Sequence, residues 1–170
     1  MIKNFTTGEM LNLWCARRGI LPLFSTDVED ETGIRASIEM EIEAWYADML
    51  RKAPVELLPV ENLVIESSVK RIDDDILEIK WPERGVRPVS LQFTNSKSVI
   101  RTFHSPGSDI ARLQRYPITR AGADCPVAVA GTRSLRVYGA IPKSADIEEL
   151  MMVARPADGS FSLDPALLKP

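Results

Sequence analysis

The chain has 170 residues, of which 45% are hydrophobic and 26% charged, and a formal net charge of −3. A chain of this length buries about two thirds of its unfolded surface, so we expect a single domain over residues 1–170. The charge balance argues against a dedicated nucleic-acid binder, which would carry a basic stripe. No apolar run approaches the roughly 20 residues of a membrane helix, and the first residues lack the pattern of a secretory leader. We therefore expect an intracellular protein.

Residues 1–53 are predicted to form a helical N-terminal part. A capping-box pattern at residues 6–9 begins one helix, and Gly19 is a plausible end for it. A second capping box at residues 26–29 begins a longer helix, which should stop before Pro54. Its apolar residues recur three and four apart, which predicts one buried stripe. The stripe consists of Ile34, Ile38, Ile42, Trp45 and Met49, and the opposite face is acidic.

Residues 54–170 alternate between apolar and polar side chains, which predicts short strands. We expect strands at 63–69 and 76–81 around the acidic turn 73–75, a hairpin of 88–93 with 98–103, and a hairpin of 126–130 with 134–138. A short helix capped by Ser108 and a final strand at 150–154 complete this part. The predicted fold class is α+β, with an N-terminal helical pair followed by an antiparallel β-sandwich or partly open barrel.

Few residues have the pattern of a catalytic or metal site. His104 is the single histidine, and its loop position indicates a structural or surface role more than a catalytic one. The run Asp73-Asp74-Asp75 is the best metal candidate, but it lacks the alternating ligands of a calcium loop, so a solvated turn is the preferred interpretation. Cys15 and Cys125 are too few for a disulfide framework and are expected to be buried free thiols. We predict no enzymatic activity, no cofactor and no metal.

Charge is distributed unevenly along the chain. The acidic helix near the N-terminus contrasts with a stretch from 101 to 136 that contains six arginines and two aspartates. Scattered surface charge is the plainest interpretation, and DNA contact is the least favoured. A more specific hypothesis is charge pairing between neighbouring subunits, which would set their orientation. The residues expected to pair are Glu39 and Glu43 with Arg112, Arg115 and Arg120.

Residues 109–128, which include a Leu-Gln helix end, a basic loop and a Pro-Val strand, resemble a segment of structural proteins from tailed bacteriophages. The strands expected at 135–139 and 149–156, and the Asp-Pro-Ala-Leu-Leu segment at 164–168, fit the same layout. The resemblance is to neck, ring or head–tail adaptor subunits. It implies a virion component assembled in the host cytoplasm, with further copies of itself and portal or tail proteins as partners and no membrane. This family brings no catalytic residues.

Three function classes stay open from the sequence. The first is a neck or head–tail connector subunit that assembles into a ring by protein–protein contacts. The second is a non-catalytic bacterial binding module with an open sheet face for a peptide or glycan, for which Trp81 is the aromatic candidate. The third, least favoured, is an enzyme that uses an unrecognised carboxylate pair.

Overall fold

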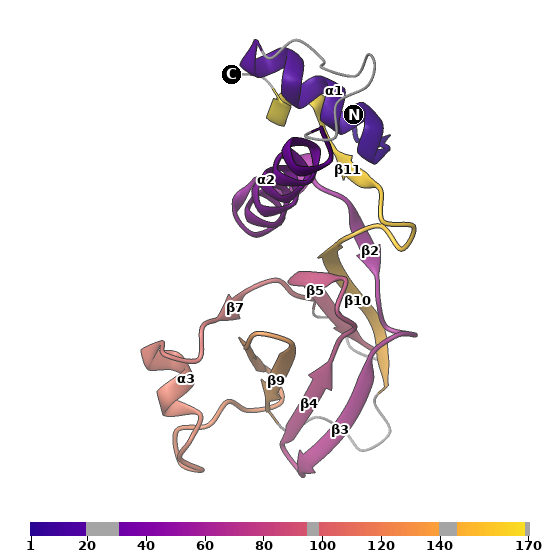
Figure 1. The fold of residues 1–170 in the computed structure, drawn as a ribbon. Coiled ribbons are helices and arrows are strands. Elements are labelled where there is room, and N and C mark those ends of the chain that lie inside the picture. Colours follow the sequence, from indigo (N-terminus) through magenta and orange to yellow (C-terminus); the bar gives the residue numbers. More distant parts are fainter. Residues whose placement is uncertain (20–30, 95–98, 140–145, 169–170) are drawn as a thin grey trace. The chain divides into compact units, whose positions relative to one another are not determined.

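The computed structural model describes residues 1–19, 31–94, 99–139 and 146–168, and its contacts divide the chain into two compact units (Figure 1). Unit 1 consists of Met1–Pro59 and Arg155–Pro170, and unit 2 of Val60–Ala154. The α+β class, with N-terminal helices ahead of all strands but the short first one, is confirmed. The single domain stays a prediction. The division predicted between residues 53 and 54 also stays a prediction; by contacts, unit 1 runs to Pro59 and includes the C-terminal segment.

Unit 1 begins with the predicted capped helix. After the short strand β1 (Lys3–Phe5), helix α1 (Thr7–Arg18) has Thr6 as its N-cap. The Thr6 hydroxyl accepts a hydrogen bond from the Glu9 amide at 3.3 Å, and the Glu9 carboxylate accepts from the Thr6 amide at 2.8 Å. Gly19 ends the helix with φ of 64°, a left-handed conformation that glycine adopts without steric cost. The capping box and the stop are therefore confirmed.

Helix α2 (Glu31–Lys52) is confirmed as the longest helix of the described residues, while the capping box predicted at 26–29 lies outside them. The predicted stripe is correct only in part. Ile42 is buried, but Ile34 is 51% exposed, and Ile38, Trp45 and Met49 are half-buried. The fully buried side chains are Ile42, Tyr46 and Leu50, which recur every four residues along one face of the helix.

The C-terminal segment returns to pack against α2. Strand β11 (Phe161–Leu163) pairs antiparallel with β1, so the final strand of the chain is not the one predicted at 150–154. Two short 3₁₀ helices, η1 (Val55–Leu57) and η2 (Pro165–Leu168), complete unit 1. The Asp164 amide donates to the Leu57 carbonyl at 2.9 Å, which ties the end of the chain to η1.

Unit 2 contains two sheets. The four-stranded sheet has the order β2-β10-β5-β6, and all its pairs are antiparallel. The five-stranded sheet has the order β3-β4-β9-β8-β7 and is antiparallel except for the β7–β8 pair. The bounds are β2 (Val60–Asn62), β3 (Ser68–Asp73), β4 (Ile76–Lys80), β5 (Gly85–Phe93), β6 (Val99–Ile100), β7 (Phe103–His104), β8 (Val127–Ala130), β9 (Ser134–Tyr138) and β10 (Ile147–Ala154).

One hydrophobic core serves both sheets of unit 2. Leu91, Leu150 and Met152 from the four-stranded sheet are fully buried together with Ile79 and Leu135 from the five-stranded sheet. Burial of apolar side chains from two facing sheets is the arrangement of a sandwich, one of the two architectures expected from the sequence. Among the described residues, no helix is both long and apolar enough to cross a membrane.

Two predicted strands are wrong in their extent. Residues 64–66 form a turn, because the Asn62 side chain accepts hydrogen bonds from the amides of both Val64 and Leu150, at 3.2 and 3.1 Å. The strand predicted at 98–103 is two short strands, β6 and β7, which belong to different sheets. The chain crosses the sandwich between them. The turn predicted at Asn95-Ser96 lies outside the described residues.

Candidate functional site

The most unusual surface of unit 2 is formed by helix α3 (Asp109–Leu113) and the residues that follow it. Ser108 caps α3 as predicted, its hydroxyl accepting from the Ala111 amide at 3.2 Å. Four large apolar side chains project into solvent here, although a short helix on a sheet normally buries them. They are Ile110, Leu113, Tyr116 and Ile118, exposed by 41%, 49%, 65% and 98%. We call these four residues, with Arg112 and Arg115 between them, the 110–118 surface.

A buried glutamine fixes the backbone that carries this surface. The Gln114 side chain is 4% exposed and donates to the Ile110 carbonyl at 3.1 Å, while its amide oxygen accepts from the Ala121 amide at 2.7 Å. The Thr119 hydroxyl donates to the Leu113 carbonyl at 2.6 Å. Because these bonds hold the segment from both ends, the exposed apolar residues lie on a structured loop.

Arg120 anchors the same loop to the sheet. Its Nη1 lies 2.9 Å from both carboxylate oxygens of Asp75, and its Nε donates to the Gln114 carbonyl at 3.1 Å. Asp73 is within 3.8 Å. Hydrogen bonding to Asp75 raises the pKa of the Arg120 guanidinium, and the nearby charges of Asp75 and Asp73 add to that effect. The β3–β4 turn is therefore an ion-pair site for the loop, not the fully solvated turn expected from the sequence.

The other candidates for chemistry are dispersed. Within residues 1–19, 31–94, 99–139 and 146–168, no group of three or more His, Cys, Asp or Glu side chains is arranged to hold a metal ion. His104 is half-buried on β7, opposite Val129 of β8. Cys15 is buried as predicted, but Cys125 is exposed, so the expectation of two buried thiols is wrong for Cys125.

The five residues expected to pair between subunits also have partners within the chain, with one exception. Glu39 forms an ion pair with Arg35 at 2.9 Å, Glu43 with Arg155 at 2.8 Å, and Arg112 with Asp109 at 3.3 Å. Arg120 binds Asp75 and is only 13% exposed. Arg115 is exposed and makes no ion pair with any residue that the structure describes. Pairing between subunits stays a prediction, and Arg115 is the member that has no ion pair among the described residues.

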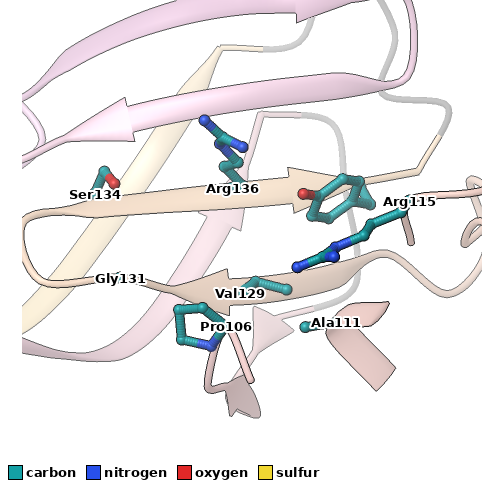
Figure 2. A pocket seen from close by; sticks show the side chains of 8 residues that line it. Pro106, Ala111, Arg115, Val129, Gly131, Ser134 and Arg136 are labelled. Carbon is teal, nitrogen blue, oxygen red and sulfur yellow. The ribbon is translucent and has the colours of Figure 1, made fainter. Parts of the chain in front are cut away.

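A pocket of about 250 Å³ lies between the α3 segment and the outer face of strands β8 and β9 (Figure 2). Side chains from β9 form one wall, and apolar residues near α3 and on β8 form the other. Its lining residues are Pro106, Ala111, Arg115, Val129, Gly131, Ser134, Arg136 and Tyr138. The sequence did not predict the pocket, because its lining residues lie up to about thirty positions apart in the chain. They come together only when β7, β8 and β9 pair in one sheet.

The structure also locates the aromatic residue expected on an open sheet face. Trp81 is 4% exposed and belongs to the core of unit 2, so it offers no surface for a glycan. Comparison of the chain with models of known protein families found no match, and comparisons with curated proteins and with solved structures also found none.

Proposed function

We propose that this protein is a structural subunit of a tailed-bacteriophage neck or head–tail connector, which assembles into a ring through protein–protein contacts. The observation that carries the proposal is the 110–118 surface. It exposes four large apolar side chains on a loop held by Gln114 and Arg120. Several large apolar side chains exposed on one ordered segment are typical of an interaction site.

The resemblance to phage structural proteins points to the same segment as an interaction site, and it does so without reference to side-chain exposure. Residues 109–128 carry the resemblance, and the exposed apolar residues lie within them. A ring subunit contacts its neighbour head to tail, so it needs a preformed surface of this kind on each copy. The alternative, a binding module with an open sheet face, is less well supported because Trp81 is buried.

The test is self-association of the purified chain, measured by mass photometry over a concentration series and by negative-stain electron microscopy. We expect closed rings for the natural sequence. Replacing Tyr116 and Ile118 with serine should weaken association by about tenfold or more, because apolar anchors dominate interface energies.

Ile65→Ser is the matched control. Ile65 is 95% exposed in the same unit but lies in the turn after β2, away from α3 in sequence. Its replacement should leave association unchanged. A natural chain that stays monomeric at every concentration, or an Ile65 variant as defective as the Tyr116/Ile118 variant, would contradict the proposal.

A further inference from the structure

The pocket beside α3 combines an apolar wall with a basic one. Pro106, Ala111 and Val129 supply the apolar wall. Val129 is only 8% exposed although it lies on the same side of the sheet as the exposed Arg136, its partner in register on β9. Successive residues of a strand point to opposite faces, so Ser134, Arg136 and Tyr138 all project on this outer side, while Leu135 and Val137 enter the core.

The charges that line the pocket are of one sign. Arg115 reaches over Val129 from the end of the α3 segment (Figure 2), and Arg136 enters from β9. The lining contains no carboxylate. Glu78, opposite Arg136 on β4, accepts from Nε and Nη2 of Arg136 at 3.2 Å each and also lies 4.0 Å from Lys80. One carboxylate is therefore shared by two cations, and Arg115 makes no ion pair with any residue that the structure describes.

We propose that this pocket binds an anionic group, a carboxylate or phosphate, that is attached to a small apolar body. Arg115 is the main partner of the anion, because a guanidinium presents several N–H donors in a geometry that suits these oxygens. The Ser134 hydroxyl adds a donor, and so does the Arg136 guanidinium, which already hydrogen-bonds Glu78 and Tyr138. The apolar body packs against Pro106 and Val129. A volume of about 250 Å³ equals about eight water molecules of liquid, which fits a single ring or a short side chain.

The anion has two possible sources: a free small molecule, or an acidic side chain of a neighbouring protein. The inference holds for either source and does not depend on the proposed function, because the pocket is complete within one chain. If the source is a neighbouring subunit, a small anion should compete with association. If it is a free molecule, binding should be equal in the weakly associating Tyr116/Ile118 variant and in the assembled natural chain.

Phenyl phosphate is a suitable probe, with inorganic phosphate and benzyl alcohol as its charged and neutral halves. Binding is followed by the backbone amide NMR signals of Ala111, Val129 and Gly131 during titration. We expect saturable shifts with phenyl phosphate at millimolar concentrations, weaker ones with phosphate and none with benzyl alcohol. Arg115→Gln should weaken binding by about tenfold, the usual loss on removing a hydrogen bond to a charged group.

Two further variants keep the test specific. Glu78→Gln should strengthen binding several-fold, because it frees the Arg136 guanidinium without altering the lining. Arg133→Gln, in the β8–β9 turn and outside the lining, should change binding by less than about twofold. The inference is overturned if the natural chain shows no saturable shifts at these signals. It is overturned equally if Arg115→Gln binds like the natural chain, or if Arg133→Gln weakens binding as much as Arg115→Gln does.

Discussion

A single hydroxyl group joins α2 to β11. Tyr46 is 1% exposed, and its hydroxyl donates to the Ser162 carbonyl at 3.1 Å and accepts from the Ser162 amide at 3.0 Å. Its ring meets Phe161 edge to face, with the ring centres 5.1 Å apart, and the Arg155 guanidinium lies 5.6 Å from the Tyr46 ring centre. A residue on the helix thus satisfies backbone groups of a strand that is more than a hundred residues away in the sequence.

Tyr46→Phe keeps the ring and removes only this hydroxyl. Because Ser162 is 5% exposed, its amide would be left buried without this partner, and we expect a loss of about 1–3 kcal/mol in the free energy of unfolding. Chemical denaturation followed by circular dichroism measures the change. Tyr116→Phe, at a position 65% exposed, is the matched control and should change stability by less than about 0.5 kcal/mol. Equal effects of the two substitutions would show that the Ser162 contacts do not stabilise the fold.

At the scale of elements, α2 is buried along only part of its length. Its C-terminal half carries Ile42, Tyr46 and Leu50 on the buried face, whereas Ile34 and Met40 are 51% and 73% exposed. An amphipathic pattern predicts which residues share a face, but burial also requires another element to cover that face. The apolar pattern therefore continues toward the N-terminal end of α2, beyond the residues whose side chains are buried.

The isoleucines of α2 provide a direct test of this gradient. Ile42→Ala should cost about 2–5 kcal/mol, as expected for a buried aliphatic side chain that leaves a cavity. Ile34→Ala should change stability by less than about 0.5 kcal/mol, since the side chain is half exposed and alanine favours the helix. The half-buried Ile38 should give an intermediate value. Urea denaturation of the three variants measures these costs, and equal costs at positions 34 and 42 would contradict the observed burial.

At the scale of the whole molecule, ion pairs connect segments that are distant in the sequence. In unit 2, Arg84 on the loop before β5 is 19% exposed and bonds to both Glu61 and Glu66, with its Nε 2.9 Å from Glu66 Oε2. Hydrogen bonding to Arg84 lowers the pKa of the Glu66 carboxyl. A second carboxyl group has a lowered pKa for a local reason. In unit 1, hydrogen bonds from the amide and hydroxyl of Thr6, three residues away in the sequence, lower the pKa of Glu9.

These lowered pKa values predict how stability depends on pH. A carboxyl group whose pKa is lower in the folded state stabilises the fold above its unfolded pKa, and this contribution disappears as the pH falls through the folded pKa. Glu66→Gln should therefore lower the thermal midpoint at pH 7, and the difference from the natural chain should shrink as the pH falls below about 4. Glu83→Gln, at a side chain 91% exposed, is the control. A difference that stays constant from pH 7 to about pH 3 would mean that the charge of Glu66 is not its source.

Features fixed by neighbouring residues were determined by the sequence itself. The capping box of α1, the Gly19 stop, the Ser108 cap and the hairpin of β8 and β9 were predicted because each depends on hydrogen bonds or backbone preferences within a few residues. The α+β class follows from the change of apolar period near residue 54, which is also local information.

Contacts between distant segments were decided only by the tertiary structure. The Asn62 side chain accepts a hydrogen bond from the Leu150 amide at the end of β2, and Arg120 forms an ion pair with Asp75, forty-five residues earlier in the chain. The same holds for the candidate site. The sequence marked residues 109–128 as notable, but it did not show that Ile118 is exposed, that Trp81 is buried or that Arg115 lines a pocket. Burial depends on which surfaces meet across the fold, and the spacing of residues along the chain does not determine which surfaces those are.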